Sequence, residues 1–419
     1  MKEKMKVCGI DVHKEFLQVC ILSRSGEKSF HRFRHTHDGI LALKDLVSVE
    51  QCEQVAFEST GIYWHMLYLA LEQDIPVIVA NAYQIKSIPG RKTDIKDSEW
   101  IAQLALNGLI KPSRIFPRID REFRDLTRNR EVLVRTRTTV KNRIHKILDS
   151  SGIRLKPLLK DIFGKSGRHL LNGIVDQADI DSVLSTIPSP VVKRRSDEIK
   201  EILNQVPSQL QLHVLRMQLS LLDEIDTKIS EIDALIVRTL VDEQREDMVI
   251  CASVPGIGST AAVTILAEIG DYRDFPSADR LASWAGLTPS VYQSADKLIT
   301  GKITKRGSTH LRWILVQAAQ AASRSKNTVF ATFFHRIAYR RGRHKAIVAL
   351  ARKILCILWH LLTHRERYSE PNLMKKVRSP RKVVLPDIPL DQAVSLLLKA
   401  GYSIFKPESG GPNLKGVRN

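Results

Sequence analysis

The stretch KVCGIDVHKEF, residues 6–16, begins with a short apolar run that ends at a carboxylate, Asp11. A run of this length between polar residues predicts a buried strand. The stretch QVAFESTGIYW, residues 54–64, repeats the pattern, and its apolar run ends at Glu58. We therefore expect two strands that each carry a carboxylate at the end.

A second pair of carboxylates lies in GRKTDIKDSEW, residues 90–100, at the start of a predicted helix. Asp94 and Asp97 are three residues apart, which places both on one helical face. Two unit charges about 4 Å apart cost roughly 4 kcal/mol at an effective dielectric constant near 20, so four converging carboxylates require a divalent cation. Oxygen ligands suit Mg²⁺ or Mn²⁺, and a metal pair supports phosphoryl transfer. For each acid taken alone, the alternative is a turn or a helix cap.

The order of predicted elements in residues 1–112 indicates an α/β domain with a mixed sheet. Residues 6–34 predict three strands with a turn at Ser25-Gly26, and a helix near residues 39–47 leads to the strand that ends at Glu58. A helix after Gly61, a strand at residues 75–79 and the Asp94 helix complete the domain. Strand-end acids that face a pair of acids on a helix are typical of an RNase H-like pocket, so we predict this fold.

Neither the histidines nor the cysteines predict a zinc site. His31, His35 and His37 lack a cysteine or a fourth ligand nearby and are interpreted as an exposed polar strand end. The five cysteines show no CxxC pair, which predicts reduced core residues of a cytoplasmic protein.

The charge of the chain indicates a polyanionic partner. Lys and Arg total 65 against 45 Asp and Glu, a net charge of +20 over 419 residues. Nucleic acid is the usual partner of such a soluble chain. The longest apolar run, residues 346–362, contains Arg352 and Lys353, so we predict a buried helix, no signal peptide and no membrane partner.

Two heptad patterns predict a coiled-coil connector within residues 113–250, with Arg130 and Arg137 at two seam positions of the first helix. The sequence leaves open whether the two helices pair within the chain or between subunits. Residues 150–207 predict a variable insertion of short helices. The apolar seam residues are Ile119, Phe123, Leu126, Leu133, Val140, Ile144 and Ile147 in the first helix and Leu215, Leu222, Ile225, Ile229, Ile232 and Ile236 in the second.

The first heptad helix also carries a basic surface. Arg128, Arg135 and Lys141 are interpreted either as a surface that tracks phosphates or as an ordinary solvated helix face.

Residues 251–365 predict a mostly helical domain. SVPGIGSTAA, residues 253–262, matches a helix-hairpin-helix turn, in which the amides near Gly256 and Gly258 would hold a DNA phosphate without reading bases. The alternative is a purely structural turn. Residues 366–419 predict a basic extension with a short helix at residues 390–400, interpreted as an arm that contacts nucleic acid.

Ser294 lies in a predicted flexible, cation-rich loop ahead of a helix that bears Arg312. A serine in such a loop is suited to attack a phosphodiester, and the surrounding cations would neutralise the transition state. Serine needs a base or a metal for activation, and no His–Asp pair lies nearby, so we look to the N-terminal acids. The cations assigned to DNA contact here are Lys297, Lys305, Arg306 and Arg312.

The motifs GIDVHK, FESTGIYW, KTDIKDSEWIAQL, SVPGIG, WAGLTPSVYQS and GKITKRGSTHLRWIL together resemble one family. It is that of the insertion-sequence transposases with an N-terminal DEDD domain and a C-terminal serine domain, relatives of the pilin-inverting recombinases. The motifs occur in the same order as in the family, and they cover both ends of residues 5–365. The resemblance implies a RuvC-like N-terminal domain, a coiled-coil connector and a helical transposase domain.

The resemblance also implies roles for single residues. Asp11, Glu58, Asp94 and Asp97 would be Mg²⁺ ligands, and Ser294 would form a covalent phosphoserine link to DNA. Family members commonly have Ser-Gly at this point, whereas Ala295 follows Ser294 here, so Ser290 stays a second candidate. Some relatives are guided by a bridge RNA made from the end of their own element.

We therefore predict a transposase and site-specific recombinase of its own insertion element. It would act on double-stranded DNA at the element ends and at the target, with Mg²⁺ and a bridge-type RNA, as a dimer or tetramer in a prokaryotic cytoplasm, associated with the nucleoid in use. One alternative is a hydrolytic RuvC-like nuclease or junction resolvase in which Ser294 is structural. The other is a nucleic-acid-binding protein without catalytic activity.

Overall fold

The computed structural model describes residues 5–59, 61–81, 85, 94–205, 207–294, 297–326, 328–370, 392, 395, 398 and 399. The chain divides into two compact units, Met1–Leu240 and Val241–Asn419. The predicted boundary between residues 250 and 251 thus falls inside α11 (Asp242–Ala252), the first helix of the second unit.

The first unit begins with a five-stranded mixed sheet in the order β3-β2-β1-β4-β5. β1 (Lys6–Val12), β2 (Phe16–Ser23) and β3 (Lys28–Arg34) form an antiparallel meander. β4 (Gln54–Glu58) and β5 (Val77–Ala80) run parallel to β1. Three antiparallel strands followed by two parallel ones, with helices on both faces, make this an RNase H-like fold, as the sequence predicts.

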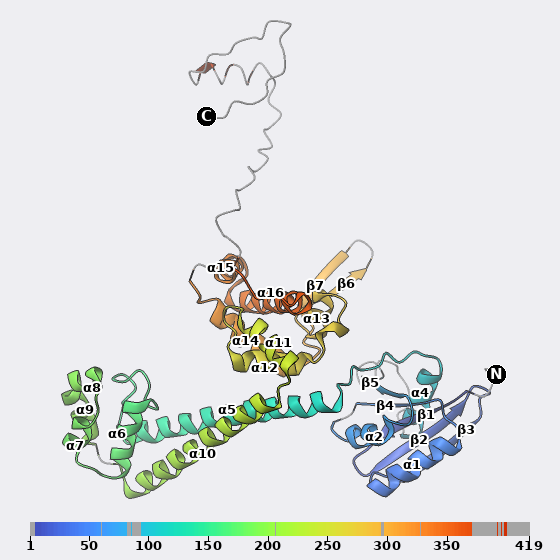
Figure 1. Ribbon diagram of the computed structural model, residues 1–419, viewed down its shortest axis with the longest axis horizontal. Helices are drawn as coiled ribbons and strands as arrows, with labels where there is room; N and C mark the ends of the chain where they lie inside the picture. The colour runs from blue at the N-terminus through green and yellow to red at the C-terminus, as the bar shows by residue number, and fades with distance from the viewer. Residues whose placement is uncertain are drawn as a thin grey trace. The chain divides into compact units, whose positions relative to one another are not determined.

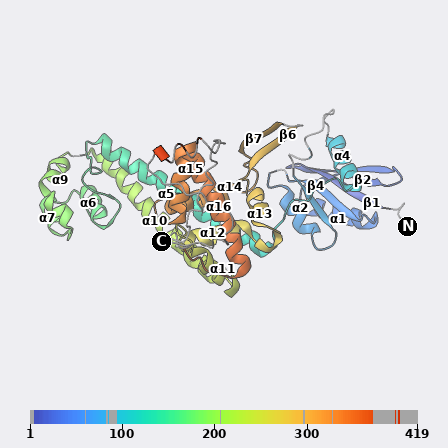
Figure 2. The same cartoon turned by 90° about the horizontal axis from the view of Figure 1, so that it is seen from above.

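Helices cover the two faces of this sheet (Figures 1 and 2). Successive side chains of a strand point to opposite faces. Ile10 and Phe57 are buried against α1 (His37–Val49) and α2 (Trp64–Leu71). On the other face, α4 (Asp94–Leu106) forms a separate apolar cluster with residues of β4 and β5.

Gly9 allows α4 to approach β1 closely. A Cβ atom at this position would lie 2.4 Å from the amide nitrogen of Ala102 and 2.4 Å from the carbonyl oxygen of Ser98. Both atoms belong to the α4 backbone, so only glycine fits here. This contact fixes the distance between the sheet and the helix that carries Asp94 and Asp97.

The two long helices predicted from heptads pair within the first unit. α5 (Arg118–Ser150) and α10 (Gln209–Thr239) lie side by side (Figures 1 and 2). The question that the sequence left open is thereby answered for these helices. Ile119, a predicted seam residue, is 72% exposed, because the partner helix ends at Thr239 and does not reach it.

The seam arginines are paired across the helices. The Nε atom of Arg130 lies 2.5 Å from Oδ1 of Asp233, and Nε of Arg137 lies 2.6 Å from Oδ1 of Asp226. The later arginine of α5 thus pairs with the earlier aspartate of α10, so the two helices run antiparallel.

Residues 150–207 fold as short helices, as predicted. They share one hydrophobic cluster with the last turns of α5 and the first turns of α10, including Ile144, Leu148 and Leu215. The insertion is therefore a helical cap on the far end of the α5–α10 pair. Its helices are α6 (Lys165–Val175), α7 (Ile180–Ser185), α8 (Pro190–Arg194) and α9 (Ser196–Leu203).

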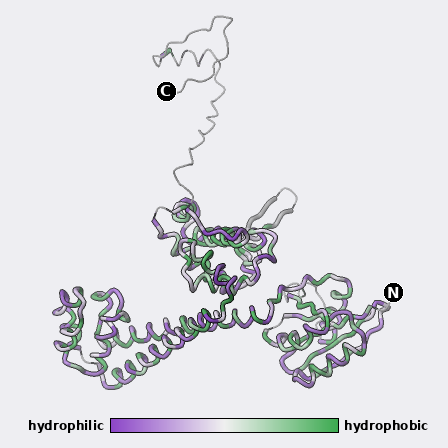
Figure 3. The backbone as a smooth tube through the Cα atoms, in the orientation of Figure 1, coloured by the Kyte–Doolittle hydropathy of each residue, from purple (hydrophilic) through white to green (hydrophobic). Residues whose placement is uncertain are grey.

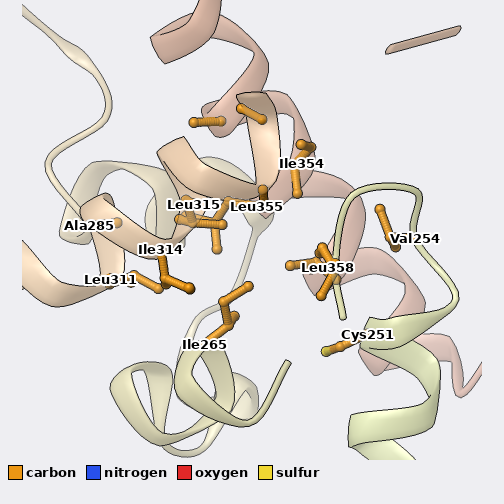
Figure 4. Close-up of a cluster of buried hydrophobic side chains, with 14 of the residues drawn as sticks. Cys251, Val254, Ile265, Ala285, Leu311, Ile314, Leu315, Ile354, Leu355 and Leu358 are labelled. Atoms are coloured by element: carbon orange, nitrogen blue, oxygen red, sulfur yellow. The ribbon is translucent and has the colours of Figure 1, made fainter. Parts of the chain in front are cut away.

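The second unit is a helical bundle with one β-hairpin. Figure 4 shows its core, in which Leu311 and Leu315 lie among side chains from other helices, such as Leu355 and Leu358, and Figure 3 shows hydrophobic residues gathered along these helices. After α11 its elements are α12 (Ser259–Ile269), η2 (Tyr272–Asp274), α13 (Ala278–Trp284), β6 (Pro289–Ser294), β7 (Lys297–Ile303), α14 (Thr309–Ala322), α15 (Val329–Arg341) and α16 (Arg343–His364).

α16 is the one helix in the described part of the chain that is long and apolar enough to cross a membrane. Its side chains from Ala346 to Leu362 contribute nine buried residues to the bundle. Its Arg352 pairs with Asp279 of α13 at 2.9 Å. It is the buried helix that the sequence predicts. All five cysteines are free, and four of them are buried.

The second unit continues beyond residue 365, where the sequence placed its end. The ring of Tyr368 stacks on Phe330 with 5.4 Å between centroids, and its amide donates to Oγ of Ser253 at 2.8 Å. The helix predicted at residues 390–400 lies almost wholly outside the described residues.

Replacing Gly9 with alanine should lower the free energy of unfolding of the first unit by about 2–4 kcal/mol, because the new methyl group would displace the α4 backbone. Chemical denaturation followed by circular dichroism measures this. Gly164→Ala is the matched control, since its nearest neighbour would lie at an ordinary 3.5 Å. Equal losses in the two variants would contradict the assigned role of Gly9.

Candidate metal and nucleic-acid site

Two predicted acids lie side by side at one edge of the sheet. β1 and β4 are parallel neighbours, and Ile10 pairs with Phe57. Asp11 and Glu58 each follow one residue later, at the carboxyl ends of their strands. Both point to the α4 face, because buried Ile10 and Phe57 occupy the opposite face.

The other two acids come from the first turn of α4. Asp94 and Asp97 are the acidic residues of this turn. Ser98, in the next turn, contacts β1 at Gly9, two residues before Asp11. The start of α4 is thus held over the sheet edge that carries Asp11 and Glu58.

Asp11, His13 and Asp94 form a compact group of potential metal ligands. One oxygen or nitrogen atom of each lies within 4.8 Å of those of the others. Nε2 of His13 lies 2.9 Å from Oδ2 of Asp11 and 3.6 Å from Oδ1 of Asp94. We name these three residues the acidic cluster. Glu58 and Asp97 flank it without joining it, as far as the described residues go.

The carboxylate of Asp11 is in an unfavourable environment for its charge. Its side chain is only 20% exposed. Burial raises the pKa of Asp11 above its ordinary value, the neighbouring charges of Asp97 and Asp94 raise it further, and His13 opposes both. A divalent cation would remove this penalty, and the donors are mainly oxygen atoms, so the residues fit Mg²⁺ or Mn²⁺.

His13 is a site residue that our sequence analysis missed. Its ring stacks on Phe16 at 4.4 Å between centroids, and the guanidinium of Arg32 covers the same Phe16 ring at 3.8 Å. The imidazole is therefore held in a fixed orientation toward the acids. A signal was present, because a residue two positions after Asp11 can share its face of the strand.

Ser294 is not in a loop, contrary to the prediction. It is the last residue of β6, and its register partner is Lys297, the first residue of β7. The hairpin stands out from the helices of the second unit (Figure 1). Ser290 lies inside the hairpin, where its Oγ donates to the carbonyl of Lys302 at 3.3 Å. Its hydroxyl is thus already used in the hairpin.

The predicted helix-hairpin-helix turn joins α11 to α12. Gly256 has a φ of +92°, and a Cβ there would lie 2.6 Å from backbone atoms of Ala318 and Ala322. Its role is therefore to pack against α14. Gly258 is the N-cap of α12, is exposed and has open space around it. Of the two glycines, Gly258 is the one whose position suits a phosphate.

The cations after the hairpin differ in their surroundings. Lys305 and Arg306 are exposed. Arg312 uses Nη1 to donate to the carbonyls of Gly307 at 2.8 Å and Ala285 at 3.3 Å, and burial lowers its pKa. Arg312 therefore joins two loops within the unit, in addition to any contact with DNA.

The basic residues of α5 are similarly engaged. Arg135 forms an ion pair with Glu131 one turn earlier. The ammonium of Lys141 lies 4.8 Å from the centroid of the Phe163 ring. Arg128 lines a cavity between the start of α5 and the RNase H-like domain. Their predicted contact with phosphates stays a prediction.

An RNase H-like sheet with acids at its edge and a helical second unit define a class of proteins that process nucleic acids. Comparison with known proteins identifies the family within this class. Residues 8–153 match the DEDD domain of IS110 elements, described as a transposase, and residues 249–335 match the transposase IS116/IS110/IS902 family. Together these matches span more than half of the chain. The protein belongs to the IS110/IS116 family of transposases.

Two relatives match over most of their length, and a third matches over a shorter part. The transposase for insertion sequence element IS1111A of Coxiella burnetii is 24% identical over 370 residues, which cover 87% of this chain and 91% of the relative. A probable family 20 transposase of Pseudomonas aeruginosa is 25% identical, over 88% and 96%. The pilin gene-inverting protein of Moraxella bovis is 31% identical over 121 residues, 28% of this chain and 38% of the relative.

A solved structure, T. thermophilus RuvC in complex with Holliday junction substrate, also matches. The match covers 26% of this chain and 99% of the RuvC chain, with 15% identity and a TM-score of 0.21.

Replacing His13 with alanine should raise the dissociation constant for Mn²⁺ about 10- to 100-fold, because His13 orients the carboxylate of Asp11. Calorimetric titration of the purified protein measures this constant. His37→Ala removes an exposed imidazole elsewhere in the same unit and should change nothing. Unchanged or tighter Mn²⁺ binding by His13→Ala would show that the imidazole has no part in the site.

Proposed function

We propose that this transposase cuts and rejoins double-stranded DNA with Mg²⁺ or Mn²⁺ held by Asp11, Glu58, Asp94 and Asp97. The observation that supports this most directly is the acidic cluster, in which a half-buried carboxylate with a raised pKa faces a second carboxylate. Glu58 is the last residue of the neighbouring strand β4, and the charge of Asp97 acts on Asp11, so both can complete the ligand set.

A bound cation of this kind would supply Lewis-acid stabilisation of the phosphoryl oxygens. The residues of the chain position the ligands and move protons. Asp11 and Asp94 provide oxygen ligands on two different elements, which fixes their separation. His13 orients Asp11 and can exchange a proton with a nearby oxygen. The backbone contact at Gly9 keeps both elements at a constant distance.

We assign the nucleophile to Ser294. Its Oγ would attack the scissile phosphorus, form a phosphoserine and release the hydroxyl of the cut strand, and a hydroxyl from the joining strand would then displace the serine. Lys305 and Arg306 are exposed after the hairpin and would neutralise the charge of the transition state. Lys297, Gly258 and Arg312 would contact the DNA around the cut.

Ser294 and the acidic cluster belong to different units of the chain. Their cooperation is the reason for proposing a homo-oligomer, a dimer or a tetramer, in which one subunit can complete the site of another. A bridge-type RNA from the element end would choose the target, and the protein would act in the prokaryotic cytoplasm. These statements rest on the family and not on the geometry.

A second function remains open because the acidic cluster lies wholly in the first unit. With water as the nucleophile, it could hydrolyse DNA as a nuclease or junction resolvase without Ser294. The two reactions differ in one product: attack by serine leaves protein covalently attached to DNA.

Ser294→Ala should bind DNA and form no denaturant-resistant protein–DNA adduct, and Asp11→Asn should lose both the adduct and strand exchange. Denaturing gel electrophoresis of labelled DNA carrying the element end measures both. Ser290→Ala is the matched control and should retain the adduct. An adduct in Ser294→Ala would move the role to another hydroxyl, and one in Asp11→Asn would show that the acids are not needed for it.

The surface of α5 provides a separate test of DNA contact. If Arg128, Arg135 and Lys141 contact phosphates, replacing all three with alanine should lower the slope of log K against log salt by about 0.9 for each lost contact. Fluorescence anisotropy at several salt concentrations measures the slope. Lys228→Ala, on α10 and paired with Glu231 at 3.0 Å, is the control. The same slope in both variants would mean that α5 presents only a solvated face.

A further inference from the structure

A cavity of about 610 Å³ lies in the first unit. Four segments line it: the turn after β1 with Lys14, the end of the β2–β3 hairpin with His35, the residues from Gly61 to Met66, and residues 114–128. Lys14 directly follows His13, and Gly61 comes three residues after Glu58. Nδ1 of His35, another lining residue, lies 2.7 Å from the carbonyl oxygen of His13. Lining residues of this cavity are thus connected to His13 of the candidate metal site, through the chain at Lys14 and through a hydrogen bond at His35.

The charge of the lining is strongly positive. It includes one lysine and four arginines, whereas Asp125 is the single acid among its described residues. Arg121 is held in place, because Nη1 donates to the carbonyl of Phe116 at 2.7 Å and Nη2 lies 3.3 Å from Glu72. A preoriented set of cations of this kind suits a phosphate-bearing ligand.

The lining also offers flat stacking surfaces. Tyr63 and Trp64 contribute rings to it, and Tyr63 is 37% exposed, whereas Phe116 is buried. The guanidinium carbons of Arg114 and Arg124 lie 4.6 and 4.3 Å from the centroid of the Phe116 ring. Aromatic rings and guanidinium planes are the groups on which unstacked bases are held.

One acceptor in this region has no partner among the residues that the structure describes. His35 makes its hydrogen bond to the carbonyl of His13 through Nδ1, which must therefore carry the proton. Nε2 is then an acceptor, and it is buried without a hydrogen bond. The amino group of a base would supply the missing donor. The ring of Tyr63 lies 6.5 Å away, edge to face.

We propose that this cavity holds one unstacked nucleotide of the DNA strand, next to the phosphate at the acidic cluster. The adjacency rests on the proposed function, whereas the binding of the nucleotide does not. The volume falls within the range of about 300–1,000 Å³ that is typical of ligand cavities. The base stacks on Tyr63, its amino group bonds to His35, and the arginines neutralise its phosphate. The cavity sets the register of the strand at the site.

Two 12-residue probes test this with the full chain in EDTA: an oligodeoxycytidine and an abasic strand with the same phosphates. Tyr63→Ala should raise the dissociation constant for the oligodeoxycytidine about 5- to 100-fold and leave that for the abasic strand unchanged. Tyr63→Phe keeps the ring and should bind like the wild type. Tyr339→Ala removes a ring that is 94% exposed in the second unit and is the matched control.

Photo-crosslinking locates the base. An oligodeoxycytidine with one 5-iododeoxycytidine should crosslink to peptides that contain Tyr63, Trp64 or Phe116. Equal affinity of wild type and Tyr63→Ala for the oligodeoxycytidine, or crosslinks confined to other peptides, would overturn the proposal. A loss seen with oligoribocytidine and not with DNA would overturn the assignment to DNA. Neither assay uses the metal or Ser294, so a failure of the proposed chemistry leaves this result intact.

Discussion

The contact between Gly9 and the backbone of α4 is the constraint on which the site depends. Because no side chain separates them, the helix lies against β1 at Ser98 and Ala102. Asp94 and Asp97 in the first turn are therefore held over the strand end that carries Asp11. A larger residue would move the helix as a rigid body, and the acids would move with it. The packing of the domain at this one glycine thus determines where the acids of α4 lie relative to Asp11.

The same closeness has an electrostatic cost. Burial is the main cause of the raised pKa of Asp11, and repulsion from the carboxylates of Asp97 and Asp94 adds to it. His13 offsets part of the repulsion by facing Asp11 and Asp94 together. Such an arrangement opposes folding and would favour a bound cation, as expected of a site selected for binding rather than for packing.

Much of this could be predicted from sequence because the signals are local. Short apolar runs that end at Asp11 and Glu58 define strands, and their parallel pairing brings the ends together. The β-hairpin was not predicted because its strands lack a clear alternation of apolar and polar residues: Leu298 and Ile299 are adjacent, and cations and polar residues surround them. His13 was overlooked for another reason: its importance depends on the distance to Asp94, which no local pattern contains.

The pairing of the long helices shows where pattern alone fails. A heptad seam is satisfied by any partner with a similar seam, so the apolar residues of α5 do not select α10. The polar positions of the seam distinguish α10 from other partners. Arg130 and Arg137 each meet an aspartate of α10 in a single antiparallel register. A shift of one heptad would leave one of the two arginines without an aspartate. The pairs are partly exposed and add little stability, so their contribution is to favour this register over the shifted ones.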